Sequence, residues 1–188
     1  MALTVTPCDL PGVLIIKPPH FSDHRGFFME THHQTRYAEA GLDRAFVQDN
    51  HSHSKSRVLR GLHYQLTRPQ GKLVFVVSGE IFDVAVDIRK GSPTFGKWTG
   101  AFLSNENKYQ IFVPEGFAHG FVVLSASADV IYKCTDFSTP GDEYGICWAD
   151  PAIAIDWQVK DPILSDKDRK CPLLSDAGAA GHLPDYRE

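Results

Sequence analysis

Short stretches in which hydrophobic and polar residues alternate follow one another along most of the chain. The clearest covers residues 81–88, where four apolar side chains share one face and Asp83 and Asp87 lie on the other. A period of two is typical of a β-strand, whose successive side chains point to opposite faces of the sheet. The same pattern predicts strands over residues 10–17, 73–77, 98–103, 109–113, 121–124, 129–134 and 145–148.

Turn-forming residues separate these strands, at 89–93, 104–107, 114–116 and 138–141. Short strands at such spacing predict an all-β sandwich or barrel. One short helix is expected over residues 34–42, where Gly41 would end it. We expect one domain spanning residues 1–188, since this length suits a single hydrophobic core, with a frayed C-terminal tail from about 176 to 188.

Composition narrows the class of protein. Hydrophobic residues make up 43% and charged residues 22% of the chain, as in ordinary globular proteins. The formal net charge of −4 gives no bias toward nucleic acid or anionic membranes. No apolar run is long enough for a bilayer, the first residues do not resemble a secretory signal, and the four cysteines lie far apart. We therefore expect a cytoplasmic protein with reduced thiols that contacts neither nucleic acid nor membrane.

Candidate chemistry is concentrated between residues 60 and 77. Arg60, His63 and Lys72 fall within thirteen residues. Histidine is the commonest general base, arginine clamps anions, and a lysine ammonium can stabilise an oxyanion. Strict alternation nevertheless places His63 on the face of Gly61 and Gln65, with Arg60 on the opposite face. Both reach one cavity only if Gly61 permits a bulge or if Arg60 lies beyond the strand end.

The turn Pro114-Glu-Gly-Phe-Ala-His119 is similar to the second motif of the cupin family, whose jelly-roll barrels often bind a metal. The first cupin motif would fall at residues 63–65, but Gln65 stands at its second histidine and no glutamate follows at the expected spacing. Two imidazoles alone make a poor site for a divalent metal. His51 and His53 are better explained as parts of an exposed polar loop over residues 50–56. We therefore predict a metal-free barrel.

Each remaining candidate also has a purely structural explanation. Tyr132 alternates with Val130 and Cys134 and so faces the interior, either as a core tyrosine with a hydrogen-bonded hydroxyl or as a proton donor in a cavity. Asp168 follows Ser165 at capping-box spacing, which also fits the cap of a short helix. Lys72 also fits as a surface lysine at the start of a strand.

These segments together resemble the dTDP-4-dehydrorhamnose 3,5-epimerase family of the dTDP-L-rhamnose pathway. The similarity runs in family order over residues 5–175, and the ordered set is specific although each segment alone is weak. It is carried by Asp23-His-Arg25-Gly-Phe-Phe-Met-Glu30, Val47-Gln48-Asp-Asn50-His-Ser, Val58-Leu-Arg60-Gly-Leu-His63-Tyr-Gln65, Gln70-Gly-Lys72-Leu-Val, Val113-Pro-Glu-Gly-Phe-Ala-His119-Gly-Phe, Tyr132-Lys-Cys-Thr-Asp, Gly145-Ile-Cys-Trp148 and Ile163-Leu-Ser-Asp-Lys167-Asp168.

The resemblance implies a cupin-like jelly roll without metal or cofactor. It also implies a homodimer in which an N-terminal strand pairs with the partner's sheet. His63 would be the catalytic base, and Asp168 would orient it and stabilise its positive charge. Tyr132 would be the acid on the opposite face of the substrate, and Lys72 would stabilise the enolate oxygen.

The resemblance further assigns contacts to the substrate, dTDP-4-dehydro-6-deoxy-D-glucose. Arg60 and His119 would contact the diphosphate and the sugar. At Ser138 the chain departs from the family, in which an aromatic residue often lies against the thymine, and the neighbouring Phe137 would normally point the other way. The other nucleotide-sugar contacts would come from Arg25, Glu30, Gln48, Asn50, Glu143 and Lys167.

In such a 4-ketosugar, C3 and C5 both flank the carbonyl, so one ketone acidifies both C–H bonds. Removing a proton gives an enolate, and returning a proton to the opposite face inverts the carbon. The expected activity is therefore epimerisation at C3 and C5. Two alternatives fit the same residues: epimerisation at only one of these carbons, or a barrel that binds nucleotide sugars without catalysis. A metal-dependent cupin oxygenase is a third.

Overall fold

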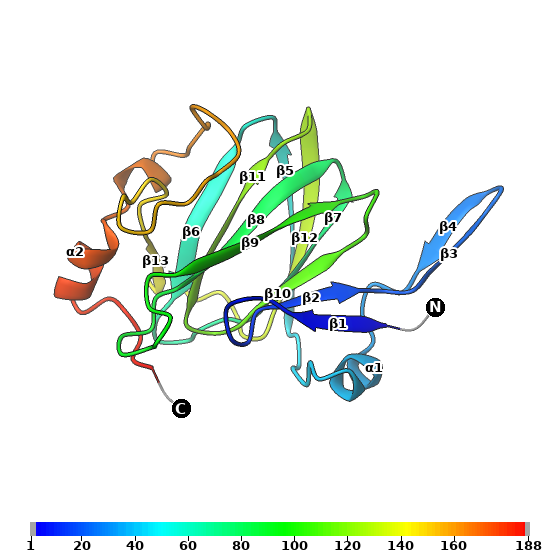
Figure 1. The fold of residues 1–188 in the computed structure, drawn as a ribbon, viewed down its shortest axis with the longest axis horizontal. Helices are drawn as coiled ribbons and strands as arrows, with labels where there is room; N and C mark the ends of the chain where they lie inside the picture. Colours follow the sequence, from blue (N-terminus) through cyan, green and yellow to red (C-terminus); the bar gives the residue numbers. More distant parts are fainter. Residues whose placement is uncertain (1–2, 187–188) are drawn as a thin grey trace.

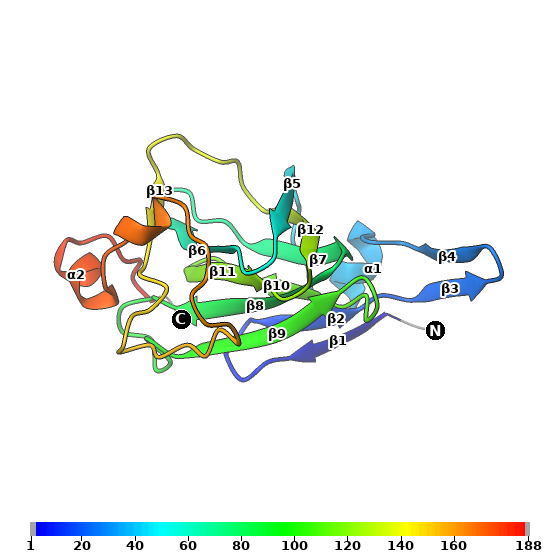
Figure 2. The same ribbon diagram turned by 90° about the horizontal axis from the view of Figure 1, so that it is seen from above.

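Two antiparallel β-sheets lie face to face in this protein, as seen in a computed structural model that describes residues 3–186 (Figure 1, Figure 2). One sheet has six strands, in the order β1 (Thr4–Pro7), β2 (Leu14–Lys17), β10 (Gln110–Val113), β7 (Lys72–Ser78), β12 (Ser127–Cys134) and β5 (Gln48–Lys55). The other has five strands, in the order β13 (Glu143–Gly145), β6 (Leu59–Gln65), β11 (Phe117–Val123), β8 (Glu80–Asp87) and β9 (Trp98–Ser104). The predicted all-β, cupin-like jelly-roll barrel is confirmed.

The hydrophobic core fills the space between the sheets and extends over the outer face of the five-stranded sheet. Strand β8 serves both regions, because Ile81 and Ala85 point between the sheets while Phe82 and Val84 point outward. Burying an isoleucine, valine or phenylalanine side chain stabilises the fold by about 1.5–3 kcal/mol. Since both faces of the strand are covered, residues 81–88 are buried throughout. Asp83 therefore lies inside the barrel, where it needs a polar partner.

Most of the predicted strands are confirmed, with shifts of a few residues at their ends. The prediction for residues 10–17 is wrong in part, because Gly12 has a φ of 89° in a turn between β1 and β2. Residues 50–56, expected to be a loop, lie almost entirely in β5. Backbone pairing with β12 holds this polar edge strand in place without requiring apolar side chains. Helix α1 (Gln34–Glu39) begins where predicted and ends before Gly41.

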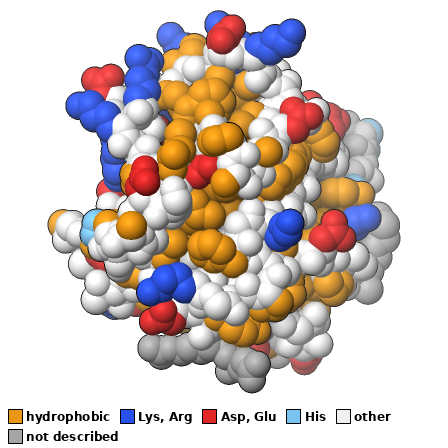
Figure 3. Space-filling view, turned by 60° about the vertical axis from the view of Figure 1, so that its left-hand side comes forward, with side chains coloured by type: hydrophobic (Ala, Val, Ile, Leu, Met, Phe, Trp, Pro, Cys, Tyr) orange, Lys and Arg blue, Asp and Glu red, His pale blue; other side chains and the backbone are white. Residues whose placement is uncertain are grey.

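The prediction of a frayed C-terminal tail is wrong for the described residues. After the short 3₁₀ helix Asp168–Lys170, the chain forms α2 (Leu174–Ala179), and Leu174, Ala177 and Leu183 are buried against the outer face of the five-stranded sheet. Small residues here permit close packing, and two leucines supply the apolar contact. Figure 3 brings this side forward and shows hydrophobic side chains across its middle, with charged ones among and around them. Residues 187–188 lie outside the described part of the chain.

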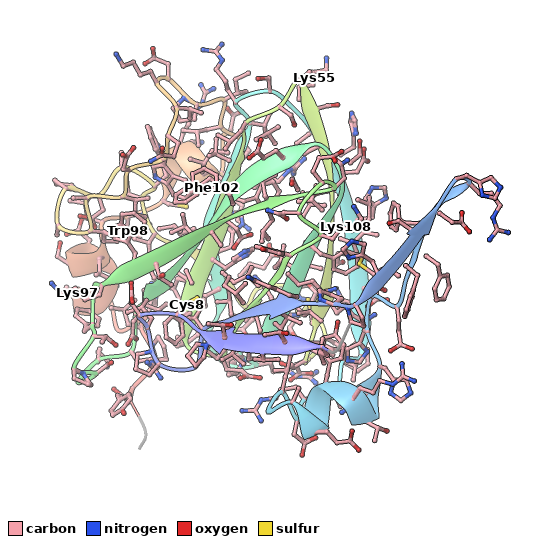
Figure 4. The ribbon with its side chains drawn as sticks, turned by 45° about the vertical axis from the view of Figure 1, so that its right-hand side comes forward. Cys8, Lys55, Lys97, Trp98, Phe102 and Lys108 are labelled. Atoms are coloured by element: carbon pink, nitrogen blue, oxygen red, sulfur yellow. The ribbon has the colours of Figure 1, made fainter. Side chains whose placement is uncertain are left out.

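A hairpin of β3 (His20–Asp23) and β4 (Gly26–Met29) projects from one end of the barrel, and we call it the arm. Figure 1 and Figure 4 show that it stands clear of both sheets. Its phenylalanines are largely exposed: Phe21 by 64%, Phe27 by 58% and Phe28 by 71%. Lys108, labelled in Figure 4, lies over the Phe27 ring at 4.5 Å. Within residues 3–186 no helix has the length and hydropathy needed to cross a membrane.

Candidate active site

A pocket of about 430 Å³ opens between strands β5 and β12 on one side and β6 and the segment 163–168 on the other. Strand β7 contributes Lys72 and β11 contributes His119 to its wall. Residues more than 100 positions apart in the chain therefore meet around one cavity. The residues proposed from the sequence that line it are Arg60, His63, Lys72, His119, Tyr132, Lys167 and Asp168.

Arg60 and His63 reach the same pocket because strand β6 is irregular between them. On the neighbouring strand β11, Phe121 pairs with Arg60 and His119 pairs with His63, so two steps along β11 match three along β6. The extra residue turns both side chains to one face. Gly61 permits this, since its φ is 129° and a Cβ atom there would lie 2.5 Å from the Gly120 Cα. Of the two arrangements that the sequence left open, the irregularity at Gly61 is the one observed, and Arg60 lies within β6.

His63 is held by a buried carboxylate. Its Nε2 atom lies 2.5 Å from Asp168 Oδ1, and Asp168 is only 3% exposed. Burial alone would raise the pKa of Asp168, but hydrogen bonds and charge from His63 and Ser165 lower it overall, so the carboxylate is ionised. Ser165 Oγ accepts from the Asp168 backbone N–H at 3.1 Å, so the capping-box spacing does form a cap. The Asp168 side chain is turned to His63 Nε2, and within residues 3–186 the other ring nitrogen, Nδ1, makes no hydrogen bond.

Tyr132 and Lys72 lie across the pocket from that histidine, on the six-stranded sheet. Neither the Tyr132 hydroxyl nor the Lys72 ammonium makes a hydrogen bond or ion pair with any group of residues 3–186. A core tyrosine with a satisfied hydroxyl is therefore not what is observed. Burial raises the pKa of Tyr132, which keeps the phenol protonated. Burial lowers the pKa of Lys72, although Cys134, Asp83 and Glu143 oppose that shift.

Asp83 is a polar residue of the site that the sequence did not single out. It is fully buried inside the barrel, and both of its carboxylate oxygens lie 2.9 Å from Nε2 of His119. Burial raises the pKa of Asp83, whereas His119 and Lys72 lower it. Asp83 thus fixes the ring of His119, which lines the pocket. An aspartate on the inner face of a strongly apolar strand was the available signal, but its partner lies 36 positions away in the sequence.

The remaining predicted contacts lie outside the lining of this pocket. Gln48 and Asn50 face inward from β5, bonded to each other at 3.1 Å. Glu143 pairs with the lining residue Lys167 at 2.7 Å, and this hydrogen bond lowers the pKa of Glu143. These three residues lie beside the pocket. Arg25 and Glu30 do not, because Arg25 is at the tip of the arm and Glu30 follows it.

Other polar residues weighed in the sequence have structural partners. Gln65 donates from Nε2 to the backbone carbonyls of Arg68 and Phe137 and accepts from the Thr139 N–H, so it ties loops together. His51 and His53 both contact Asp129 Oδ1 on β12, at 2.9 Å and 3.2 Å. Within the described chain, no three His, Cys, Asp or Glu side chains are arranged as metal ligands.

Ser138 stands where the family often has the aromatic residue that lies against the thymine. Its backbone N–H donates to Gln48 Oε1 at 2.8 Å. The Phe137 ring is 52% exposed and has the Arg68 guanidinium 6.0 Å from its centroid. It is therefore an accessible aromatic face, next in sequence to the residue that bonds Gln48. The role of either residue in base binding stays a prediction.

The pocket combines a histidine base, a phenol without a hydrogen-bond partner on the facing sheet, and a half-buried cation. This set suits removal of a proton from carbon next to a carbonyl, stabilisation of the resulting oxyanion, and return of a proton from the other side. The exposed guanidinium of Arg60 suits an anionic substituent.

Comparison with known proteins agrees with this chemistry. The family model for dTDP-4-dehydrorhamnose 3,5-epimerase matches residues 7–176. The dTDP-4-dehydrorhamnose 3,5-epimerase of Neisseria gonorrhoeae is 59% identical over 160 residues, 85% of this chain, and the chain spans 49% of that relative's length. The crystal structure of a dTDP-6-deoxy-D-glucose-3,5-epimerase from Legionella pneumophila, solved with dTDP-4-keto-L-rhamnose, is 50% identical with a TM-score of 0.94, over 99% of this chain and 100% of that one.

A narrower activity also occurs on this fold. The 3'-monoepimerase ChmJ from Streptomyces bikiniensis, solved with dTDP-quinovose, is 34% identical to this chain with a TM-score of 0.90. The match covers 96% of this chain and 92% of that one. Overall fold alone therefore does not distinguish inversion of two carbons from inversion of one.

Proposed function

Because the chain belongs to the dTDP-4-dehydrorhamnose 3,5-epimerase family, we propose that it inverts both C3 and C5 of dTDP-4-dehydro-6-deoxy-D-glucose. The observation that carries this proposal is the meeting of His63, Tyr132 and Lys72 around one pocket, with the base and the phenol on facing sheets. A ketohexose lying between them presents one face to each. One base, one acid and one oxyanion stabiliser then serve both carbons in turn.

His63 removes the proton. Nε2 is engaged by Asp168, whereas Nδ1 has no partner in the described part of the chain and can accept the proton. As the ring gains a proton it becomes an imidazolium, and the adjacent carboxylate stabilises that charge and fixes the ring orientation. Positioned acid–base groups typically supply about 10²–10⁴ in rate.

Lys72 and Tyr132 complete the reaction. Proton loss at C3 or C5 places negative charge on the C4 oxygen, and the Lys72 ammonium stabilises it by on the order of 3–4 kcal/mol. The interaction is stronger in this half-buried position than in water, because fewer solvent dipoles compete. Tyr132 then donates its phenolic proton to the opposite face of the carbon, and the stereocentre inverts.

The nucleotide holds the sugar in register. The Arg60 side chain is anchored by donation from Nε to Ser54 Oγ at 2.9 Å, which leaves guanidinium N–H groups for a diphosphate. Gln48, Asn50 and the Glu143–Lys167 pair lie beside the pocket as contacts for the rest of the nucleotide. Binding energy from these remote groups keeps the reacting carbons aligned between base and acid.

Product stereochemistry tests this function. Purified protein would be incubated with dTDP-4-dehydro-6-deoxy-D-glucose and the ring proton couplings followed by NMR. Inversion at C3 and C5 supports the proposal. Inversion at one carbon assigns the protein to the narrower activity that ChmJ represents, and unchanged substrate excludes an epimerase.

We further propose that the protein works as a homodimer in which the arm of each chain reaches the partner's pocket. Two predicted substrate contacts, Arg25 and Glu30, belong to the arm region and do not line the pocket of their own chain. The exposed phenylalanines of the arm favour covering by another surface. A two-fold dimer allows both arms to cross in the same way, and the predicted pairing of an N-terminal strand with the partner's sheet would be part of the same dimer.

Mixing two inactive variants tests the crossed arms. Arg25→Ala removes a contact on the arm and His63→Ala removes the base in the pocket, so each alone is expected to be strongly impaired. A mixed dimer would contain one site with an intact arm and an intact base. Random mixing is expected to recover about one quarter of wild-type activity, since about half of the dimers are mixed and each regains one site. Absence of recovery, with mixed dimers confirmed by differently tagged chains, contradicts the crossed arrangement.

The pH dependence reports on Lys72, which must be charged to stabilise the enolate. Burial lowers the pKa of Lys72, so activity is expected to fall on the alkaline side before the pH of about 10.4 at which an exposed lysine titrates. Burial raises the pKa of Tyr132, so the phenol loses its proton at a higher pH than an exposed tyrosine does. The residual activity of Lys72→Arg should persist to higher pH, since guanidinium stays charged. An alkaline limb at the same pH in both proteins would show that another group causes it.

A further inference from the structure

Besides the phenol of Tyr132, a second hydroxyl in the pocket wall, that of Ser52, has no partner among residues 3–186. Ser52 Oγ is buried and makes no hydrogen bond with any described residue, yet Ser52 lines the pocket. Native structures keep few buried polar groups unpaired, because losing water without gaining a hydrogen bond is unfavourable. The other orphan atom, His32 Nε2, lies elsewhere, beside Tyr37 and Phe46.

The neighbours of Ser52 on strand β5 already have partners. Gln48 and Asn50 bond to each other, and Gln48 also accepts from the Ser138 N–H. Ser54, two residues further along the same face, accepts from Arg60 Nε. Ser52 therefore stands alone in an inward-facing polar row, with Val130 opposite it on β12. Neither neighbour on the strand nor the cross-strand residue satisfies it, and the pocket that Ser52 lines is the remaining place for a partner.

We propose that Ser52 Oγ hydrogen-bonds an oxygen of the ketosugar in the bound nucleotide sugar. The inference rests on the proposed function and adds a specificity contact to it. Ser52 shares the pocket with His63, Tyr132 and Lys72, which act on the sugar. Gln48 and Asn50 on the same strand do not line that pocket, and we have placed them with the rest of the nucleotide. A fixed hydroxyl beside the sugar limits how the ring turns when the reaction passes from one carbon to the other.

The Ser52→Ala variant tests the proposal, because its thermal stability and its activity are expected to respond differently. In the free protein the substitution removes an unpaired buried hydroxyl, so the midpoint of thermal unfolding should stay the same or rise. With dTDP-4-dehydro-6-deoxy-D-glucose, kcat/KM should fall about 3- to 10-fold, as expected for one neutral hydrogen bond. Affinity for dTDP, which lacks the ketosugar, should not change.

Ser54→Ala is the matched contrast on the same strand. Ser54 is bonded to Arg60 in the free protein, so its loss should lower the unfolding midpoint. If Ser52→Ala is destabilised in the same way, the hydroxyl of Ser52 has a structural role, and the proposal is overturned. If Ser52→Ala weakens dTDP binding by the same factor as it lowers kcat/KM, the assignment of Ser52 to the ketosugar is overturned.

The wild-type protein in the same assay separates the two levels of the argument. If wild type turns over the ketosugar and Ser52→Ala has the same kcat/KM, the inference fails while the proposed function stands. If wild type does not turn over the ketosugar, the proposed function fails and the inference fails with it.

Discussion

The His63→Ala variant is expected to lose proton exchange and net epimerisation together, with kcat about 10²–10⁴-fold below wild type. His63 is the base for both carbons, so no step of the reaction precedes its action. The pocket offers no substitute at the same place, since the imidazole of His119 is tied to Asp83 through Nε2. NMR in deuterated water measures exchange at C3 and C5 and inversion in one experiment.

His63→Asn is the control for this variant. Removing the imidazole leaves Asp168 buried without its partner, which destabilises the pocket for a reason unrelated to proton abstraction. Asparagine keeps an N–H group to donate to the carboxylate but cannot act as a base. Both variants should be inactive, with Asn closer to wild type in thermal stability. Turnover within tenfold of wild type in either one would remove His63 from the mechanism.

The Tyr132→Phe variant is expected to separate exchange from inversion. The base is intact, so His63 still removes a proton and returns deuterium from solvent to the same face. The opposite face lacks its donor, and net inversion should fall by about 10²-fold or more. The ring itself is kept, and the hydroxyl has no partner in residues 3–186 to lose, so the fold should be unaffected.

The measurement is the ratio of deuterium incorporated to product formed, compared between Tyr132→Phe and wild type. In wild type, deuterium incorporation should keep pace with product formation. In the variant, deuterium should enter many times for each inversion. A Tyr132→Phe protein that inverts both carbons at the wild-type rate would show that the opposite-face acid is another group.

Local pattern was enough for most of the fold because a β-strand repeats every two residues. It placed the two faces of residues 81–88 and the inward direction of Tyr132. It failed where burial depends on a distant surface. Leu174 and Leu183 are buried only because the outer face of the five-stranded sheet needs a cover, and small residues around them resemble a flexible tail. Strand β5 was missed because its side chains are polar on both faces.

The site was predictable to a similar extent. Motifs close in sequence located Arg60, His63 and Lys72, and the conflict over faces pointed to the bulge that the structure contains at Gly61. Pairings between distant strands were beyond any local pattern. The contact of Asp83 with His119 spans 36 positions and was not foreseen. The unpaired hydroxyl of Ser52 is visible only when all its neighbours are in place, because an absent partner leaves no trace in the sequence.

The most direct test of the mechanism is the origin of the hydrogens at the two stereocentres. Wild-type protein would convert dTDP-4-dehydro-6-deoxy-D-glucose in deuterated water, and NMR would measure deuterium at C3 and C5 of the product. A base on one face and a solvent-exchanging phenol on the other require deuterium at both inverted carbons. Inverted product that retains the original hydrogen at both carbons would contradict proton transfer between His63 and Tyr132.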